Sequence, residues 1–236
     1  MKRLLPFIII LGVLGVAVGS VLYMTRTKSA TPGEVGPQSS NQPSPSPSQK
    51  TVITGVPGGE PAHTLGSADA PVHIEEFGDF QCPPCGMFHP ILKQMKEEFG
   101  DKLQVTFRNF PLANHNHAVA AASAAEAAGM QNKFWEMHAL IYEHQNDWSG
   151  SFDVRPTFEG YAKQLGLDVE RFKRDVTSDR VEQRIYMDGK RARSMNVNST
   201  PTVFMNGRDM PFQQFMRPDQ LRVLIQDEIT AVEKKK

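Results

Sequence analysis

The stretch Asp79-Phe80-Gln81-Cys82-Pro83-Pro84-Cys85 contains both cysteines of this 236-residue chain, three positions apart. A disulfide between residues this close would close a loop too short to stabilise a fold by restricting the unfolded chain. The spacing therefore predicts redox or metal chemistry and argues against a structural crosslink.

The segments on either side of this stretch predict a β-α-β unit. Residues 72–80 (VHIEEFGDF) are rich in β-forming side chains, and after the cysteines apolar residues recur at helical spacing as far as Gly100. Residues 103–110 (LQVTFRNF) predict a second strand. The cysteines then lie at a strand-to-helix turn, where active sites are common.

Cys82 is expected at the start of the helix. Unpaired amide hydrogens and the positive end of the helix dipole should lower the pKa of its thiol there. Pro83 and Pro84 fit the first helical turn, because that turn does not use their missing amide hydrogens. Cys85 follows one turn later on the same face, so that Cys82 can attack a disulfide and Cys85 can resolve the mixed disulfide.

The alternative for the cysteines is a zinc site, with Cys82, Cys85, His89 and either His115 or His117 as ligands. Structural zinc sites usually have a second ligand pair at a recognisable spacing, and this sequence has none. Without a metal, His89 is expected on the helix surface, and His115 and His117 at a helix start, where polar residues commonly cap the helix or face water.

The second half of the chain predicts mostly helices. Eight alanines lie between Ala118 and Ala128, an aromatic helix face follows, and helical character extends over about residues 114–198. Residues 202–205 return to strand character before the hairpin signal Asn206-Gly207 and a C-terminal apolar helix. This pattern indicates an α/β fold with a helical insertion.

Composition indicates one globular domain of balanced charge. The chain is 39% hydrophobic and 22% charged, and it has 26 basic and 26 acidic residues. No strong positive field is available to attract nucleic acid, so nucleic acid is excluded as an expected partner.

The N-terminal region predicts a membrane anchor and a tether. Residues 4–24 carry no charge and have about the length that spans a bilayer, and Lys2 and Arg3 favour a cytoplasmic N-terminus. We expect residues 1–28 to be a retained anchor; a signal peptide cleaved near Ala17-Val18-Gly19 is the alternative. Residues 29–62 are expected to be a disordered Pro- and Ser-rich linker, and residues 63–236 an extracytoplasmic domain.

From about Leu65 to Ile225 the sequence resembles the DsbA-like branch of the thioredoxin superfamily, particularly its membrane-tethered bacterial members. The matching segments are residues 70–77, residues 79–85, Phe110-Pro111-Leu112 with His115 and Ala118, residues 133–138 (KFWEMH), and Ser199-Thr200-Pro201-Thr202 with Asn206-Gly207. The resemblance implies a thioredoxin-like α/β fold with a helical insertion.

The resemblance also implies substrate-binding residues. A cis peptide bond is expected between Thr200 and Pro201, with this loop lying against the cysteine pair. Thr200 and Pro201, together with Pro83 and Pro84, are therefore expected to contact substrate. Many strongly oxidising members have histidine at the position of Pro84, so the oxidising strength of this chain is left open.

Glu76, six positions before Cys82, is implied to be a buried acid that exchanges protons with Cys85. Strand alternation supports burial independently, because Val72, Ile74 and Glu76 share one face, and burial would raise the pKa of Glu76. The alternative is a carboxylate at the strand end that reaches water.

The function implied by the resemblance is an enzyme, a thiol-disulfide oxidoreductase that introduces disulfides into exported polypeptides. It would need no cofactor beyond the Cys82–Cys85 pair, and a membrane redox partner would recharge it. A reductase or isomerase of the same fold is the closest alternative, because only the redox potential and the recharging partner differ. A non-catalytic module that holds unfolded segments is a further alternative.

Overall fold

The computed structural model describes residues 63–234, in which five strands form one sheet. The strand order is β1-β3-β2-β4-β5, and only β2 and β3 are parallel. The strands are β1 (His63–Leu65), β2 (Val72–Gly78), β3 (Leu103–Asn109), β4 (Thr202–Met205) and β5 (Arg208–Asp209).

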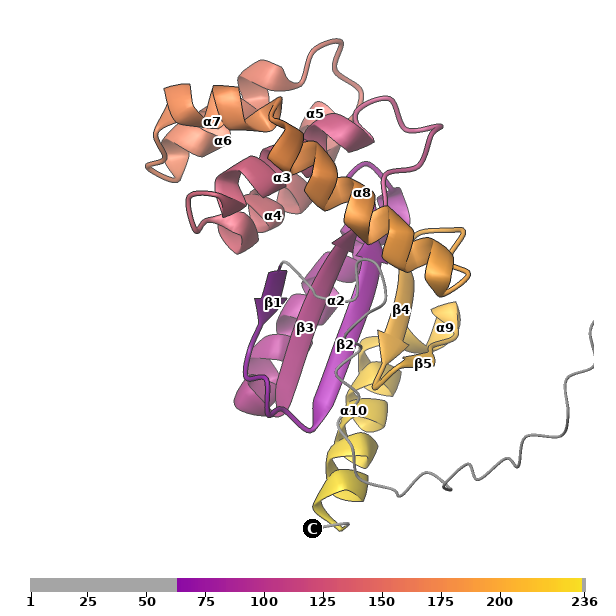
Figure 1. The fold of residues 1–236 in the computed structure, drawn as a ribbon. Coiled ribbons are helices and arrows are strands. Elements are labelled where there is room, and N and C mark those ends of the chain that lie inside the picture. The colour runs from indigo at the N-terminus through magenta and orange to yellow at the C-terminus, as the bar shows by residue number, and fades with distance from the viewer. Residues whose placement is uncertain (1–62, 235–236) are drawn as a thin grey trace, which may run out of the picture. The chain divides into compact units, whose positions relative to one another are not determined.

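The β-α-β unit predicted around the cysteines is confirmed. Helix α2 (Pro83–Phe99) and the short 3-10 helix η1 (Gly100–Lys102) connect β2 to β3 (Figure 1). The predicted hairpin is also present: β4 and β5 are joined at Asn206 and Gly207, whose φ angles are 49° and 77°. Strand β1 was not predicted, because three residues are too few to show a period.

Helices cover both faces of the sheet. Helix α2, the short helix α9 (Phe212–Phe215) and α10 (Pro218–Glu233) pack on one face, and α8 (Asp179–Ser194) packs on the other (Figure 1). The α2 and α10 face buries Val72 and Ile74 of β2, and the α8 face buries Phe77. Alternate residues of β2 therefore enter two different cores.

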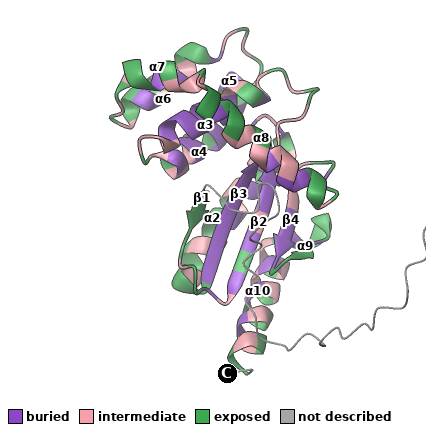
Figure 2. Cartoon of the chain, viewed as in Figure 1, coloured by how far each residue is buried: buried purple, intermediate pink, exposed green. Residues whose placement is uncertain are grey.

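The predicted helical insertion separates β3 from β4. It consists of α3 (Ala118–Gly129), α4 (Phe134–Glu143), α5 (Gln145–Trp148), α6 (Arg155–Gln164), α7 (Val169–Val176) and α8. The alanine-rich α3 is buried around most of its circumference (Figure 2). Small side chains allow the neighbouring helices to approach α3 closely, which explains the run of alanines.

The expected anchor at residues 1–28 and linker at residues 29–62 lie outside the described residues. Among the helices within residues 63–234, none combines the length and the apolar character needed to cross a bilayer.

Candidate active site

Cys82 directly precedes the first turn of α2, as the sequence predicted. Pro83 and Pro84 are the first two residues of the helix, and Cys85 is the third. Both thiols are free, and Cys82 and Cys85 are 4% and 0% exposed. The Cys82 carbonyl oxygen accepts from the amide of Gly86 at 3.1 Å, which closes the first helical turn.

The surroundings shift the pKa values of the two thiols in opposite directions. A hydrogen bond from the Cys85 thiol is the main cause that lowers the pKa of Cys82 to about 6. Burial is the main cause that raises the pKa of Cys85 well above its usual value. At neutral pH this favours a thiolate at Cys82 beside a protonated Cys85, and only the thiolate is a nucleophile for disulfide exchange.

The Thr200–Pro201 loop lies against Cys82, as the resemblance implied. The peptide bond between Thr200 and Pro201 is cis. The Sγ atom of Cys82 donates to the carbonyl oxygen of Thr200 at 3.4 Å, although the residues are 118 positions apart. Pro83, the residue after Cys82, is exposed. The fold thus brings the four expected substrate contacts to the cysteine end of α2.

Glu76 is buried, with 2% of its surface exposed, and the expectation from strand alternation is confirmed. It lies on β2 between Phe107 of β3 and Val203 of β4. Burial, followed by the charge of Cys82, raises the pKa of Glu76 to about 8. Its Oε1 atom has no hydrogen-bond partner among the described residues. A carboxyl group with this pKa can take up and release a proton near neutral pH.

Asp79, which sequence reasoning did not single out, fixes the loop before the cysteines. It is 1% exposed, and its carboxylate accepts hydrogen bonds from the amides of Gln81 and Leu112, each at 2.8 Å. The contact with Gln81 is an Asx-type turn that the residue type favours. The contact with Leu112 joins positions 33 apart and has no signal in the sequence.

His115 and His117 lie just before α3, as expected, and both are partly exposed. The Nδ1 atom of His115 is 2.7 Å from Oδ2 of Asp79. His117 also contacts protein, with Nε2 2.8 Å from the carbonyl oxygen of Ser151. The expected surface residue His89 has a side chain only 10% exposed. The expected surface position was wrong for His89, because α4 of the helical insertion packs against α2.

The zinc hypothesis required the cysteines and these histidines to converge. Within residues 63–234, no group of three or more His, Cys, Asp or Glu side chains is arranged to hold a metal ion. His115 and His117 instead contact Asp79 and Ser151, as described above.

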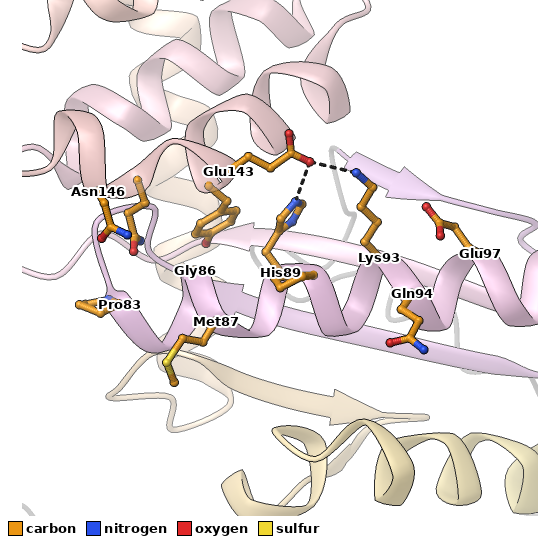
Figure 3. Close-up of a pocket in the computed structure, with 12 residues that line it drawn as sticks. Pro83, Gly86, Met87, His89, Lys93, Gln94, Glu97, Glu143 and Asn146 are labelled. Carbon is orange, nitrogen blue, oxygen red and sulfur yellow. Dashed lines mark hydrogen bonds and ion pairs between the residues drawn. The ribbon is translucent and has the colours of Figure 1, made fainter.

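A groove of about 650 Å³ begins next to Pro83 and runs between α2 and the α4–α5 region (Figure 3). In Figure 3, His89 and Lys93 of α2 point toward Glu143 of α4. The Nζ atom of Lys93 donates to Oε1 of Glu143 at 2.9 Å, and Nε2 of His89 is 3.9 Å from the same oxygen. Tyr142 also lines the groove.

Comparisons with known proteins point to one family. A model of the thioredoxin family matches residues 59–227. The probable disulfide bond formation protein D of Bacillus cereus is 35% identical over 151 residues, which cover 61% of this chain and 69% of that protein. The crystal structure of oxidised BdbD from Bacillus subtilis is similar, with a TM-score of 0.62 and 25% identity, covering 71% of this chain and 92% of that chain.

Some relatives are much longer than this chain. The Na(+)/H(+) antiporter NhaA 1 of Mycolicibacterium vanbaalenii is 40% identical over 148 residues, which cover 61% of this chain but 23% of that protein. The chain spans about a quarter of the length of this relative. The similarity therefore concerns one segment of the longer protein.

Proposed function

The chain belongs to the thioredoxin family, in its DsbA-like branch of thiol-disulfide oxidoreductases, and on this premise we propose that it introduces disulfides into exported polypeptides through Cys82 and Cys85. The observation that carries the proposal is the placement of the pair: Cys82 directly precedes α2 with its Sγ 3.4 Å from the Thr200 carbonyl oxygen, and Cys85 is fully buried one turn later. These surroundings lower the pKa of Cys82 to about 6 and raise that of Cys85. Stabilising the thiolate stabilises the reduced pair, which makes the disulfide a stronger oxidant.

The first half of the reaction uses the oxidised pair. A substrate thiolate attacks the sulfur of Cys82, and the bond between Cys82 and Cys85 breaks. Cys85 leaves as a thiolate and takes a proton from the carboxylic acid of Glu76. A second substrate thiolate then attacks the substrate sulfur of the mixed disulfide. Cys82 leaves as a stable thiolate, and the substrate carries the new disulfide.

The enzyme is now reduced by two electrons and must be reoxidised. The oxidant in the proposal is a disulfide of a membrane partner. The Cys82 thiolate attacks one sulfur of this disulfide, and the other partner sulfur leaves as a thiolate. Glu76 then takes the proton of Cys85, and the Cys85 thiolate attacks the sulfur of Cys82. This restores the pair and releases the second partner thiolate, so the partner takes up the two electrons as a dithiol. An anchor at residues 1–28 in the cell membrane, with the domain on the extracytoplasmic side, would raise the local concentration of both partners.

Thr200 and Pro201, with Pro83 and Pro84, form the proposed substrate contacts around Cys82. This assignment is supported by the 3.4 Å contact between Cys82 and the Thr200 carbonyl oxygen. Cys82 is 4% exposed and Cys85 is 0% exposed, so of the two sulfurs Cys82 is the one a polypeptide at this end of α2 can reach.

The test combines trapping with a redox titration. Cys85→Ala should accumulate a mixed disulfide between Cys82 and a reduced polypeptide treated with oxidant, and Cys82→Ala should accumulate none. The equilibrium potential of the pair, titrated against glutathione, should lie nearer about −120 mV than about −270 mV. A potential near the lower value would contradict the oxidase and indicate a reductase. Full activity of Cys82→Ala would contradict thiol chemistry and favour a binding module.

A further inference from the structure

The proposed function leaves Glu76 with a proton to exchange in every cycle. Its side chain is 2% exposed, and Cys85 beside it is 0% exposed. A carboxyl group this deeply buried needs a path by which protons reach solvent. The following inference rests on the proposed function and concerns that path.

Tyr142 lies between Glu76 and the groove. Its residue surface is 4% exposed, and its hydroxyl has no hydrogen-bond partner among the described residues. A Cβ atom placed on Gly78 would come within 2.9 Å of this hydroxyl and 2.4 Å of the Phe107 ring. Gly78 follows Glu76 by two positions on β2, so both share one face of the strand. The Tyr142 hydroxyl therefore lies over β2 next to Glu76. A side chain at position 78 would collide with it, so this position requires glycine.

The other side of Tyr142 meets the groove. Tyr142 and His89 both line it, and their rings stack with centroids 5.4 Å apart and planes at 24°. Within residues 63–234, the Nε2 atom of His89 also has no hydrogen-bond partner, since its distance of 3.9 Å from Glu143 is too long for one. Glu76, Tyr142 and His89 thus each have a buried polar atom that makes no hydrogen bond to the described residues, and together they lead from the cysteine pair to the groove.

Buried polar atoms are rarely left unpaired in native proteins unless water or a functional requirement accounts for them. Here the three residues with unpaired atoms follow one another from β2 (Glu76) through α4 (Tyr142) to α2 (His89). This arrangement is what a chain of water molecules entering from the groove would need.

The charges around Tyr142 keep its hydroxyl protonated. Burial, followed by the charges of Cys85 and Glu76, raises the pKa of Tyr142 well above its usual value. Asp79 and Cys82 act in the same direction from the loop and the start of α2. On α4, burial lowers the pKa of His138, which therefore stays neutral. A neutral hydroxyl can accept one proton while donating another, so it can pass protons without ionising.

We propose that Tyr142 is a positioning residue whose hydroxyl holds the proton path between Glu76 and the groove lined by His89. When Cys85 leaves as a thiolate, Glu76 gives it a proton and regains one from groove water through the Tyr142 hydroxyl. During reoxidation the same protons move in the opposite direction. No electron passes through Tyr142, and no bond other than O–H bonds changes there.

Tyr142→Phe tests this path because it removes the hydroxyl and keeps the ring. The measurement is the rate at which Cys85 resolves a preformed mixed disulfide between Cys82 and glutathione, from pH 6 to pH 9. We expect about a tenfold lower rate in Tyr142→Phe, with the largest loss near the pKa of Glu76. The alkylation rate of the Cys82 thiolate and the melting temperature should not change. Tyr161→Phe, on α6 and outside the residues that line the groove, is the matched control and should behave like the parent.

Glu76→Gln separates the path from the proposed function. It should slow resolution by at least as much as Tyr142→Phe, and the double variant should be no slower than Glu76→Gln alone, because Tyr142 acts through Glu76. A slow Glu76→Gln with an unchanged Tyr142→Phe would overturn the path and leave the proposed function intact. Normal rates in both variants would instead remove Glu76 from the proposed mechanism. Additive losses in the double variant would overturn a path through Glu76.

Discussion

Two identical side chains, one helical turn apart, differ in proton affinity because their surroundings differ. Cys82 precedes the first turn of α2 and receives a hydrogen bond from the Cys85 thiol, which stabilises its thiolate. Cys85 lies in the core, where burial destabilises a charge. The low pKa of Cys82 therefore depends on the presence of Cys85, and replacing Cys85 tests this dependence.

Replacing Cys85 should raise the pKa of Cys82. Cys85→Ala removes the largest cause of the lowered pKa and should move it from about 6 upward by about 1 to 2 units, the value of a hydrogen bond to a charged group. Cys85→Ser retains a donor and should raise it less. The pH dependence of Cys82 alkylation measures both variants. An equal pKa in the alanine variant and the parent would show that the helix start alone stabilises the thiolate.

Glu76 should make the stability of the reduced protein depend on pH. Its pKa rises from 4.5 to about 8 on folding, so between these values the folded state binds more protons than the unfolded state. The contribution of Glu76 to the free energy of unfolding is therefore fully present below pH 4.5. It falls as the pH rises toward 8, by at most about 5 kcal/mol in total. Glu76→Gln removes this loss.

Denaturant unfolding of the reduced parent and of Glu76→Gln checks the expected effect. The two should be similar near pH 4.5, and the variant should become progressively more stable toward pH 8. Cys82 titrates in both proteins, so its contribution largely cancels in the comparison. A constant difference across this range would mean that Glu76 does not titrate in the folded protein with a raised pKa.

At the level of elements, periodicity and residue type correctly predicted the strands, helices and turns that depend on short stretches of sequence. The strand before the cysteines, the helix from Pro83 and the hairpin at Asn206 and Gly207 all follow from short stretches with strong preferences. The position of Glu76 on the buried face also follows, because alternation along β2 is local. The Thr200 contact required the family resemblance, since nothing near residue 200 indicates what lies beside it.

Contacts between distant elements could not be predicted. Helix α5 approaches the start of α2, where Nε2 of Gln145 donates to the carbonyl oxygens of Phe80 and Cys82 at 2.7 and 2.9 Å. Gly86 permits this approach, because a Cβ atom there would lie 2.6 Å from Oε1 of Gln145. Neither residue stands out in the sequence. The groove lined by Tyr142 and His89 was missed for the same reason.

At the scale of the whole domain, the sheet separates two kinds of packing. Glu76 and the cysteines lie on the α2 face of β2, whereas Glu75 points to the opposite face. There Glu75 accepts from Nε of Arg108 at 2.8 Å and from Arg191 of α8 at 3.1 Å. Charged contacts thus attach the end of the helical insertion to the face of the sheet away from the chemistry.

Asp188 of α8 is central to this attachment. It is 1% exposed and accepts from Arg108 at 3.2 Å and from the backbone amide of Asn109 at 3.1 Å, and it also pairs with Arg184. Asp188→Ala would leave the 1%-exposed Arg108 with less compensation for its buried charge. Breaking a buried pair from one side typically costs about 3 to 5 kcal/mol.

We therefore expect Asp188→Ala to lower the unfolding free energy by about 3 to 5 kcal/mol while leaving the pKa of Cys82 near 6. Glu170→Ala is the control, because its pair with Lys173 is exposed and should contribute at most about 0.5 kcal/mol. Denaturant unfolding and the pH dependence of alkylation measure the two quantities separately. If Asp188→Ala shifted the Cys82 pKa as much as Cys85→Ala does, the two faces of the sheet would be coupled. The insertion would then have to be counted among the determinants of the thiol chemistry, because loosening α8 would change the environment of α2 through the strands between them.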